Sequence, residues 1–186
     1  LVGSEMCIRD RYISKVKVEN GKYSEEYNFD NLELAKVEIP SRRINGAKVT
    51  LEYTVSIENI GDLEGYAENV IDYLNSDLQF DESQNSDWFK GTDGYIYVKN
   101  MNQTLLKPGD KKEIKLILTK TMDGNNTGTH SNKVAILEAY SSDNVSENAE
   151  NNNSVQNTLI LVSTGGATTI ICLLYTSPSP RDPKTS

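Results

Sequence analysis

Alternation between apolar and polar positions is the strongest pattern in the chain, and it is clearest between Lys48 and Glu58. The apolar positions of this segment are Val49, Leu51, Tyr53, Val55 and Ile57. A period of two predicts a β-strand with one buried and one solvated face. Because such alternation is typical of antiparallel sheets, the segment indicates an all-β fold.

The same period recurs in shorter segments, which turn signals separate from one another. The further predicted strands are 13–18, 34–39, 65–74, 78–80, 95–99, 114–119 and 133–140. Asn20-Gly21 predicts a type I′ hairpin turn, and the sequence KPGD at 107–110 has the Pro and Gly positions of a type II turn. Short strands at regular spacing predict an Ig-like antiparallel β-sandwich. We assign it to residues 34–140 and interpret residues 12–33 as a leading hairpin or the end of a preceding module.

Two segments after the predicted sandwich differ in composition. Residues 141–157 are rich in Asn, Ser and Glu, with hardly an apolar side chain to bury, and we interpret them as a solvated linker. Residues 158–171 carry no charge. Their first part, 158–163, fits a terminal β-strand about as well as a membrane segment, whereas from Gly165 onward the pattern favours the start of a transmembrane helix. Because a bilayer takes roughly twenty residues to cross, we expect a membrane anchor that is cut short.

The two ends of the chain look foreign to the rest. Residues 1–11 and 172–182 can be back-translated into DNA segments that are reverse complements of each other. Unrelated protein termini have no physical reason to share this relationship, so we interpret 1–11 and 172–186 as a translated sequencing adapter and its tail. The remaining residues 12–171 then carry 15 basic and 24 acidic side chains, a net charge of −9, and we expect them to be truncated at both ends.

The composition argues against several classes of function. The chain has 186 residues, a net charge of −8 and 37% hydrophobic residues, which is typical of a soluble body. The acidic surplus argues against nucleic-acid binding, because phosphate contacts need clustered Lys and Arg. Both cysteines lie in the adapter-like ends and there is one histidine, so we expect no disulfide, thiol nucleophile, metal or cofactor. A cysteine-free body fits an exported bacterial protein.

Single residues with chemical potential have plainer explanations. The one histidine, His130, has no nucleophile or metal partner in a recognisable spacing, and we expect it in a surface loop. The acidic residues between Asp72 and Asp93 lack the alternating order of a calcium loop. Glycoside hydrolysis uses paired carboxylates, but the sequence shows no aromatic-rich sugar platform, and a carbohydrate-active enzyme is the most remote alternative. We therefore expect a protein that is not an enzyme.

The polar, turn-rich segment 81–94 suggests a different kind of function. It holds Trp88 and Phe89, which would anchor a ligand if they were exposed at one end of the sandwich and would pack in the core if they were buried. A ligand-binding module that uses this loop is the alternative to a purely structural role.

Several motifs together resemble a known family. They are YTVSIENIG (53–61), GYA (65–67), VIDYL (70–74), LLKPG (105–109) and SNKVAI (131–136). In this order and spacing, they resemble the bacterial conserved-repeat domain, a domain-of-unknown-function family (number eleven) of Gram-positive surface proteins. The resemblance covers residues 34–140 and implies an Ig-like, extracellular stalk or adhesive module with a following anchor. Asn75 stands where the family often has Pro, and no Leu-Pro-x-Thr-Gly sorting motif is present, so a membrane anchor is expected in preference to covalent wall attachment.

A covalent cross-link is one further hypothesis. Surface sandwiches of Gram-positive bacteria often join their first and last strands by a Lys–Asn isopeptide bond, which a neutral buried carboxyl group assists. The candidates are Lys36 on the early strand, Asn132 at the start of the last strand, and Asp72 between them. The alternative is that Lys36 points to solvent and Asn132 caps a turn.

The expected function is thus that of a non-enzymatic, membrane-proximal stalk or spacer in a cell-surface protein. Its expected partners are neighbouring domains of the same protein, host or cell-wall ligands, and the membrane through the anchor.

Overall fold

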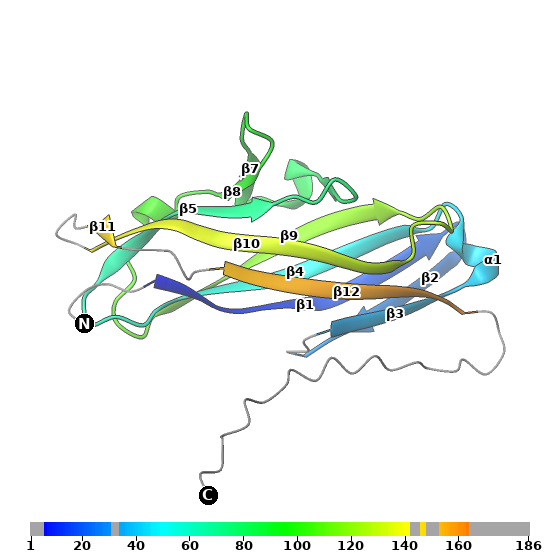
Figure 1. Cartoon of the computed structure of the whole chain (residues 1–186), viewed down its shortest axis with the longest axis horizontal. Coiled ribbons are helices and arrows are strands. Elements are labelled where there is room, and N and C mark those ends of the chain that lie inside the picture. The colour runs from blue at the N-terminus through cyan, green and yellow to red at the C-terminus, as the bar shows by residue number, and fades with distance from the viewer. Residues whose placement is uncertain (1–5, 31–33, 142–145, 148–152, 164–186) are drawn as a thin grey trace, which may run out of the picture.

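Two β-sheets pack face to face in the computed structural model, which describes residues 6–30, 34–141, 146–147 and 153–163 (Figure 1). The first sheet has the strand order β2-β1-β4-β9-β6. Its strands are β1 (Met6–Asn20), β2 (Tyr23–Asn28), β4 (Lys48–Asn59), β6 (Gln79–Phe80) and β9 (Lys111–Thr121). Each neighbouring pair in this sheet is antiparallel.

The second sheet has the order β3-β12-β10-β5-β8-β7, with β11 beside β10. Its strands are β3 (Leu34–Pro40), β5 (Gly65–Tyr73), β7 (Trp88–Lys90), β8 (Ile96–Val98), β10 (Gly128–Ser141), β11 (Ser146–Glu147) and β12 (Asn153–Ser163). The pairs are antiparallel except β12 and β3, which run parallel. The helical turns are α1 (Ser41–Ile44), η1 (Glu82–Gln84) and η2 (Met101–Gln103).

The strand order is that of an immunoglobulin sandwich. One sheet contains β1-β4-β9-β6 and the other contains β5-β10-β12, which match the A-B-E-D and C-F-G orders of that fold. The predicted all-β, Ig-like antiparallel sandwich is therefore confirmed.

The alternation in β4 does build the core. Its apolar positions Val49, Leu51, Tyr53, Val55 and Ile57 are all fully buried. On the opposite face, where we expected solvated side chains, Thr54 and Ser56 are buried as well. Thr54 lies between Tyr12 of β1 and Lys115 of β9 in the ladder register, and longer neighbours on both sides cover a short side chain on a central strand.

The leading hairpin is part of the sandwich. β1 pairs with β4 from Met6 to Glu19, so it contributes a full-length strand to the first sheet. Its first residues belong to the adapter-like segment 1–11. The hairpin loop is also shifted by one residue from the expected one: Asn20 pairs with Tyr23, and the loop is Gly21-Lys22. Gly21 has φ of 60° and no positive φ is recorded at Lys22, which fits a type II′ turn better than the predicted type I′ turn.

The last strand also belongs to the sandwich. β12 includes 153–157, which we expected to be linker, and 158–163, for which a terminal strand was one of two alternatives. It pairs with β10 on one side and β3 on the other. Ladder hydrogen bonds come from the backbone, so polar side chains do not prevent a segment from filling a vacant place between two strands. The expected anchor from Gly165 onward lies outside the described residues, and within the described part no helix is long and apolar enough to cross a membrane.

The start of β1 and the end of β12 lie at opposite ends of the long axis (Figure 1). Met6 pairs with Asn59 at the end of β4, and Ser163 pairs with Pro40 at the end of β3, beside α1. The chain therefore runs into the sandwich at one end and out of it at the other.

Candidate functional site

Lys36 does not reach the proposed cross-link partners, which corrects that part of the isopeptide hypothesis. Its ammonium forms a 2.9 Å ion pair with Glu38, and about a third of its side chain is exposed (34%). In β3, Ala35, Val37 and Ile39 point into the core, so the residues between them face outward. The alternation in LAKVEI (34–39) already indicated this orientation, because it places Lys36 on the opposite face of the strand from Ala35, Val37 and Ile39.

Asp72 and Asn132, by contrast, do meet. Asn132 Nδ2 donates a 2.8 Å hydrogen bond to Asp72 Oδ2, and both side chains are buried. They lie on the neighbouring strands β5 and β10, where Asp72 pairs with Val134. Asn132 Oδ1 also accepts a hydrogen bond from the backbone N–H of Lys133. This geometry is a buried amide–carboxyl contact between strands.

Trp88 is a packing residue. It therefore does not anchor a ligand, as a binding module that uses the segment 81–94 would require. It is fully buried, and its Nε1–H donates a 2.8 Å hydrogen bond to the carbonyl of Lys115 in β9. Ile117 lies two residues after Lys115 in β9, and the Asn85 side chain binds its backbone. Asn85 Oδ1 accepts a hydrogen bond from the Ile117 N–H, and Asn85 Nδ2 donates one to the Ile117 carbonyl. Next to it, β6 pairs with Leu118 and Thr119.

These contacts together cover the outer edge of β9. The short strand β6 is continued by the side chains of Asn85 and Trp88, which satisfy backbone groups that β6 does not reach. Natural proteins protect sheet edges because unpaired N–H and C=O groups are templates for association. The segment around η1 therefore has a structural task that the sequence pattern did not reveal.

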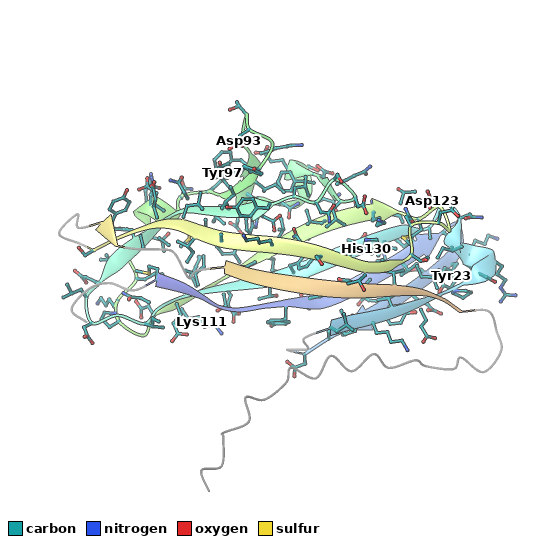
Figure 2. The ribbon with its side chains drawn as sticks, viewed as in Figure 1. Tyr23, Asp93, Tyr97, Lys111, Asp123 and His130 are labelled. Atoms are coloured by element: carbon teal, nitrogen blue, oxygen red, sulfur yellow. The ribbon has the colours of Figure 1, made fainter. Side chains whose placement is uncertain are left out.

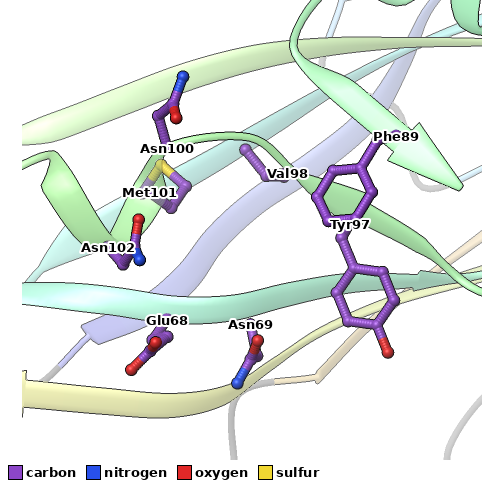
Figure 3. A pocket seen from close by; sticks show the side chains of 8 residues that line it. All are labelled: Glu68, Asn69, Phe89, Tyr97, Val98, Asn100, Met101 and Asn102. Atoms are coloured by element: carbon purple, nitrogen blue, oxygen red, sulfur yellow. The ribbon is translucent and has the colours of Figure 1, made fainter. Parts of the chain in front are cut away.

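Phe89 remains at the surface, with 39% of it exposed. Its ring stacks on that of Tyr97 with a centroid distance of 5.5 Å and an angle of 23°. Both residues line a pocket of about 150 Å³ between β5, the β7–β8 hairpin and η2 (Figure 3). The lining residues are Glu68, Asn69, Phe89, Tyr97, Val98, Asn100, Met101 and Asn102.

Tyr97 is held by its own hairpin. Its hydroxyl donates a 2.5 Å hydrogen bond to Asp93, and Figure 2 shows the pair on the part of the molecule that projects from the sandwich. The hydrogen bond to Asp93 raises the pKa of the Tyr97 hydroxyl, and the same contact lowers the pKa of the Asp93 carboxyl. A Cβ atom at Gly91 would lie 2.7 Å from the Tyr97 ring, so this position needs glycine for the ring to keep its place.

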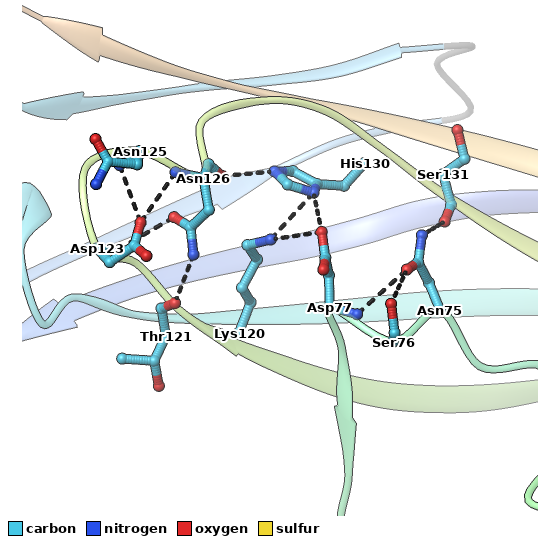
Figure 4. A network of polar contacts seen from close by, with 10 residues as sticks. All are labelled: Asn75, Ser76, Asp77, Lys120, Thr121, Asp123, Asn125, Asn126, His130 and Ser131. Atoms are coloured by element: carbon cyan, nitrogen blue, oxygen red, sulfur yellow. Dashed lines mark hydrogen bonds and ion pairs between the residues drawn. The ribbon is translucent and has the colours of Figure 1, made fainter.

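His130 is buried in β10, whereas the sequence led us to expect it in a surface loop (Figure 4). Lys120 Nζ lies 3.3 Å from its Nδ1, and its Nε2 lies 3.1 Å from the Asn126 carbonyl. The neutral tautomer with the proton on Nε2 satisfies both contacts. Asp77 lies 3.2 Å from the Lys120 ammonium and balances its charge.

Burial lowers the pKa of His130, and the nearby positive charge of Lys120 lowers it further. A protonated ring would direct an Nδ1–H toward the Lys120 ammonium. The Asn126 carbonyl and the Asp77 carboxylate, which lies 3.8 Å from Nδ1, act in the opposite direction, but the net shift of the pKa is downward and favours the neutral imidazole.

Asp81 has a structural role at the start of the helical turn η1. Asp81 Oδ1 accepts hydrogen bonds from the N–H and the hydroxyl of Ser83 and caps η1, and these bonds hold the pKa of Asp81 below its usual value. In the residues that the structure describes, no group of three His, Cys, Asp or Glu is placed to hold a metal ion.

A buried asparagine at the other end of the molecule was also missed. Asn59 Nδ2 donates to the carbonyls of Leu63 and Leu106, both at 2.8 Å, and its Oδ1 accepts from the Gly61 N–H. The Asn-x-Gly pattern after β4 signalled only a turn. The long-range bond to Leu106 depends on the topology.

Comparison with protein-family models and with curated proteins finds no match to this chain.

Proposed function

We propose that this chain is a non-enzymatic spacer module of a bacterial cell-surface protein, as its resemblance to the conserved-repeat domain suggests. The observation that carries the proposal is the course of β1 and β12: β1, also from Tyr12 onward, runs away from one end of the sandwich, and β12 ends at the opposite end, beside α1. A module that receives the chain at one end and releases it at the other adds its full length to a stalk.

The ladders that hold these two strands lie along the same axis. β1 pairs with β4 over its length, and β12 pairs with both β10 and β3. A force along the long axis loads many hydrogen bonds of each ladder together, because ladder bonds are roughly perpendicular to the strands. The strand arrangement thus supports a role in carrying tension between neighbouring domains.

Single-molecule stretching tests this role. Handles at the two chain ends should give one unfolding event with a gain in contour length of roughly 500 Å, since an extended residue spans about 3.3–3.6 Å. The matched control pulls from cysteines placed at Gly61 and Lys107, with Cys7 and Cys172 replaced by Ser. Gly61 follows β4 and Lys107 precedes β9, at the same end of the β4–β9 ladder. Pulling at these positions therefore opens the hydrogen bonds of this ladder one after another.

We expect a higher rupture force for end-to-end pulling than for the control. A rupture force no higher than that of the control would contradict a role in carrying tension. The surface location has a separate test, which is to recover the flanking gene sequence. An apolar run that continues past Ile171 and ends in Lys or Arg supports the proposed anchor, and a stop codon or a new soluble domain there contradicts it.

A further inference from the structure

We propose that the pocket between β5, the β7–β8 hairpin and η2 binds one neutral sugar ring of a glycan, an activity beyond the spacer role. The sequence suggested no aromatic sugar platform, but the fold brings Phe89 and Tyr97 together from two strands. Figure 3 shows this aromatic pair on one side of the pocket, with the side chains of η2 on the other.

The aromatic side of the pocket suits the apolar face of a pyranose. The C–H groups on one face of such a ring carry small positive charges, which complement the negative face of an aromatic ring. The Phe89 ring is accessible, with 39% of the residue exposed, and the Tyr97 ring stacks on it. Val98 and Met101, both buried, add apolar surface to the lining.

The polar side of the pocket suits sugar hydroxyls. Asn100 and Asn102 are exposed carboxamides, and Glu68 adds a carboxylate. A carboxamide both donates and accepts hydrogen bonds, as a hydroxyl does. Asn69 donates from Nδ2 to Glu138, and its carbonyl oxygen remains as an acceptor on the same rim.

The size and charge of the pocket narrow the choice of ligand. About 150 Å³ is smaller than the roughly 300–1,000 Å³ of sites for drug-sized molecules, so a single ring at a chain end or branch fits the space. The carboxylates of Glu68, Glu138 and Asp93 lie in or beside the lining and oppose an anionic sugar. Glu68 supplies the one carboxylate of the lining, and glycoside hydrolysis uses two, so the inferred chemistry is binding.

Backbone strain also collects at this pocket. Asn69 (φ 50°) and Asn100 (φ 59°) are the non-glycine residues with positive φ in the described part of the chain, and both line the pocket. They belong to different elements, because Asn69 lies within β5 and Asn100 precedes η2. Left-handed backbone in residues other than glycine is uncommon and clusters at ligand sites.

Titration of the isotope-labelled full chain, followed by NMR, tests the proposal. The probes are the methyl glycosides of glucose, galactose, mannose and N-acetylglucosamine, with glucuronic acid as the anionic comparison. We expect saturable shifts at the lining residues for at least one neutral glycoside, with a dissociation constant in the low-millimolar range expected of so small a ligand. Weaker or absent binding of glucuronic acid is expected.

Variants decide whether this pocket is responsible. Phe89→Ala should weaken binding at least tenfold, and Asn102→Ala should weaken it several-fold. The matched control is Tyr95→Ala, since Tyr95 is an equally exposed aromatic of the same hairpin that packs on Tyr73 and does not line the pocket. Because Phe89 and Asn102 are outside the core, both variants should keep the wild-type unfolding midpoint.

The proposal is overturned by an absence of shifts with all four glycosides up to about 50 mM, far above a millimolar dissociation constant. It is also overturned if Phe89→Ala binds as well as the unmodified chain, or if Tyr95→Ala loses binding to the same extent. None of these results depends on the stretching behaviour, so the spacer role is tested separately.

Discussion

Asn132 Nδ2 donates a 2.8 Å hydrogen bond to Asp72 Oδ2 across the β10–β5 ladder, in a region from which solvent is excluded. A buried carboxyl group needs such a donor, because its desolvation is otherwise uncompensated. The contact joins the strands that correspond to C and F of an Ig sandwich.

Removing the amide should weaken the fold. We expect Asn132→Ala to lower the free energy of unfolding by about 1–3 kcal/mol, since the Asp72 carboxyl loses this donor. Urea denaturation followed by circular dichroism measures the change. Asn102→Ala, at an exposed asparagine, is the control and should stay within about 0.5 kcal/mol of the unmodified chain. Equal stability of the two variants would argue that the buried contact contributes nothing.

The surface position of Lys36 leads to a prediction about covalent structure. We expect the intact mass of the denatured chain to equal the mass calculated from its sequence, because the Lys36 ammonium is paired with Glu38 outside the core. Mass spectrometry of the purified chain checks this. A mass that is short by one ammonia, and that returns to the calculated value in Lys36→Arg, would show that the cross-link forms after all.

The covered edge of β9 gives a prediction about both stability and association. Asn85→Ala leaves the N–H and the carbonyl of Ile117 without the side-chain partners described above. We expect a loss of about 1–3 kcal/mol in the free energy of unfolding and more self-association, because the edge can then pair with another chain. Chemical denaturation and size-exclusion chromatography with light scattering measure the two effects.

Trp88→Phe is a second test of the same edge, since it keeps an aromatic ring but removes the donor to Lys115. It should cost about 2–4 kcal/mol, from the unpaired carbonyl and the smaller ring. A variant of either residue that stays monomeric and fully stable would mean that the edge needs no cover.

His130 makes stability depend on pH in the neutral range. Its pKa is lowered from 6.5 in the folded chain, so near and below pH 6.5 the unfolded chain binds more protons than the folded chain. Stability therefore falls as the pH falls through this range and is fully present above it. We expect a lower urea midpoint at about pH 5.5 than at about pH 7.5, and a smaller difference in His130→Gln.

The chain has one histidine, and no other side chain has its usual pKa in this interval. If His130→Gln retains the whole pH difference, the effect comes from elsewhere.

The strands could be predicted from the sequence because a period of two directly reports burial on one face. The type II turn is a second success: Gly109 has φ of 82° and the Asp110 N–H donates to the Lys107 carbonyl. β12 was harder to recognise, because its first residues are polar and its place depends on a gap between two distant strands. Local composition does not contain that information.

The same distinction applies to the candidate residues. Asp72 and Asn132 were selected as partners and do meet, whereas Lys36 faces outward, which was the stated alternative to the cross-link. For Trp88 the sequence left a ligand anchor and a core residue as alternatives, and His130 was interpreted as a loop residue. Their burial depends on contacts with Lys115 and Lys120 of β9, and such contacts between elements leave no periodic trace.

The parallel pairing of β3 with β12 has a consequence for how the chain reaches its folded state. β3 has no other strand partner in the described sheets. Its ladder with β12, in which Ala35 pairs with Thr158, can form only when both segments are present. Contacts so far apart in sequence form slowly, because a long loop must close first. During synthesis, β3 therefore cannot take its place in the second sheet until residues 153–163 have emerged. The last strand thus sets the moment at which this edge of the second sheet is completed.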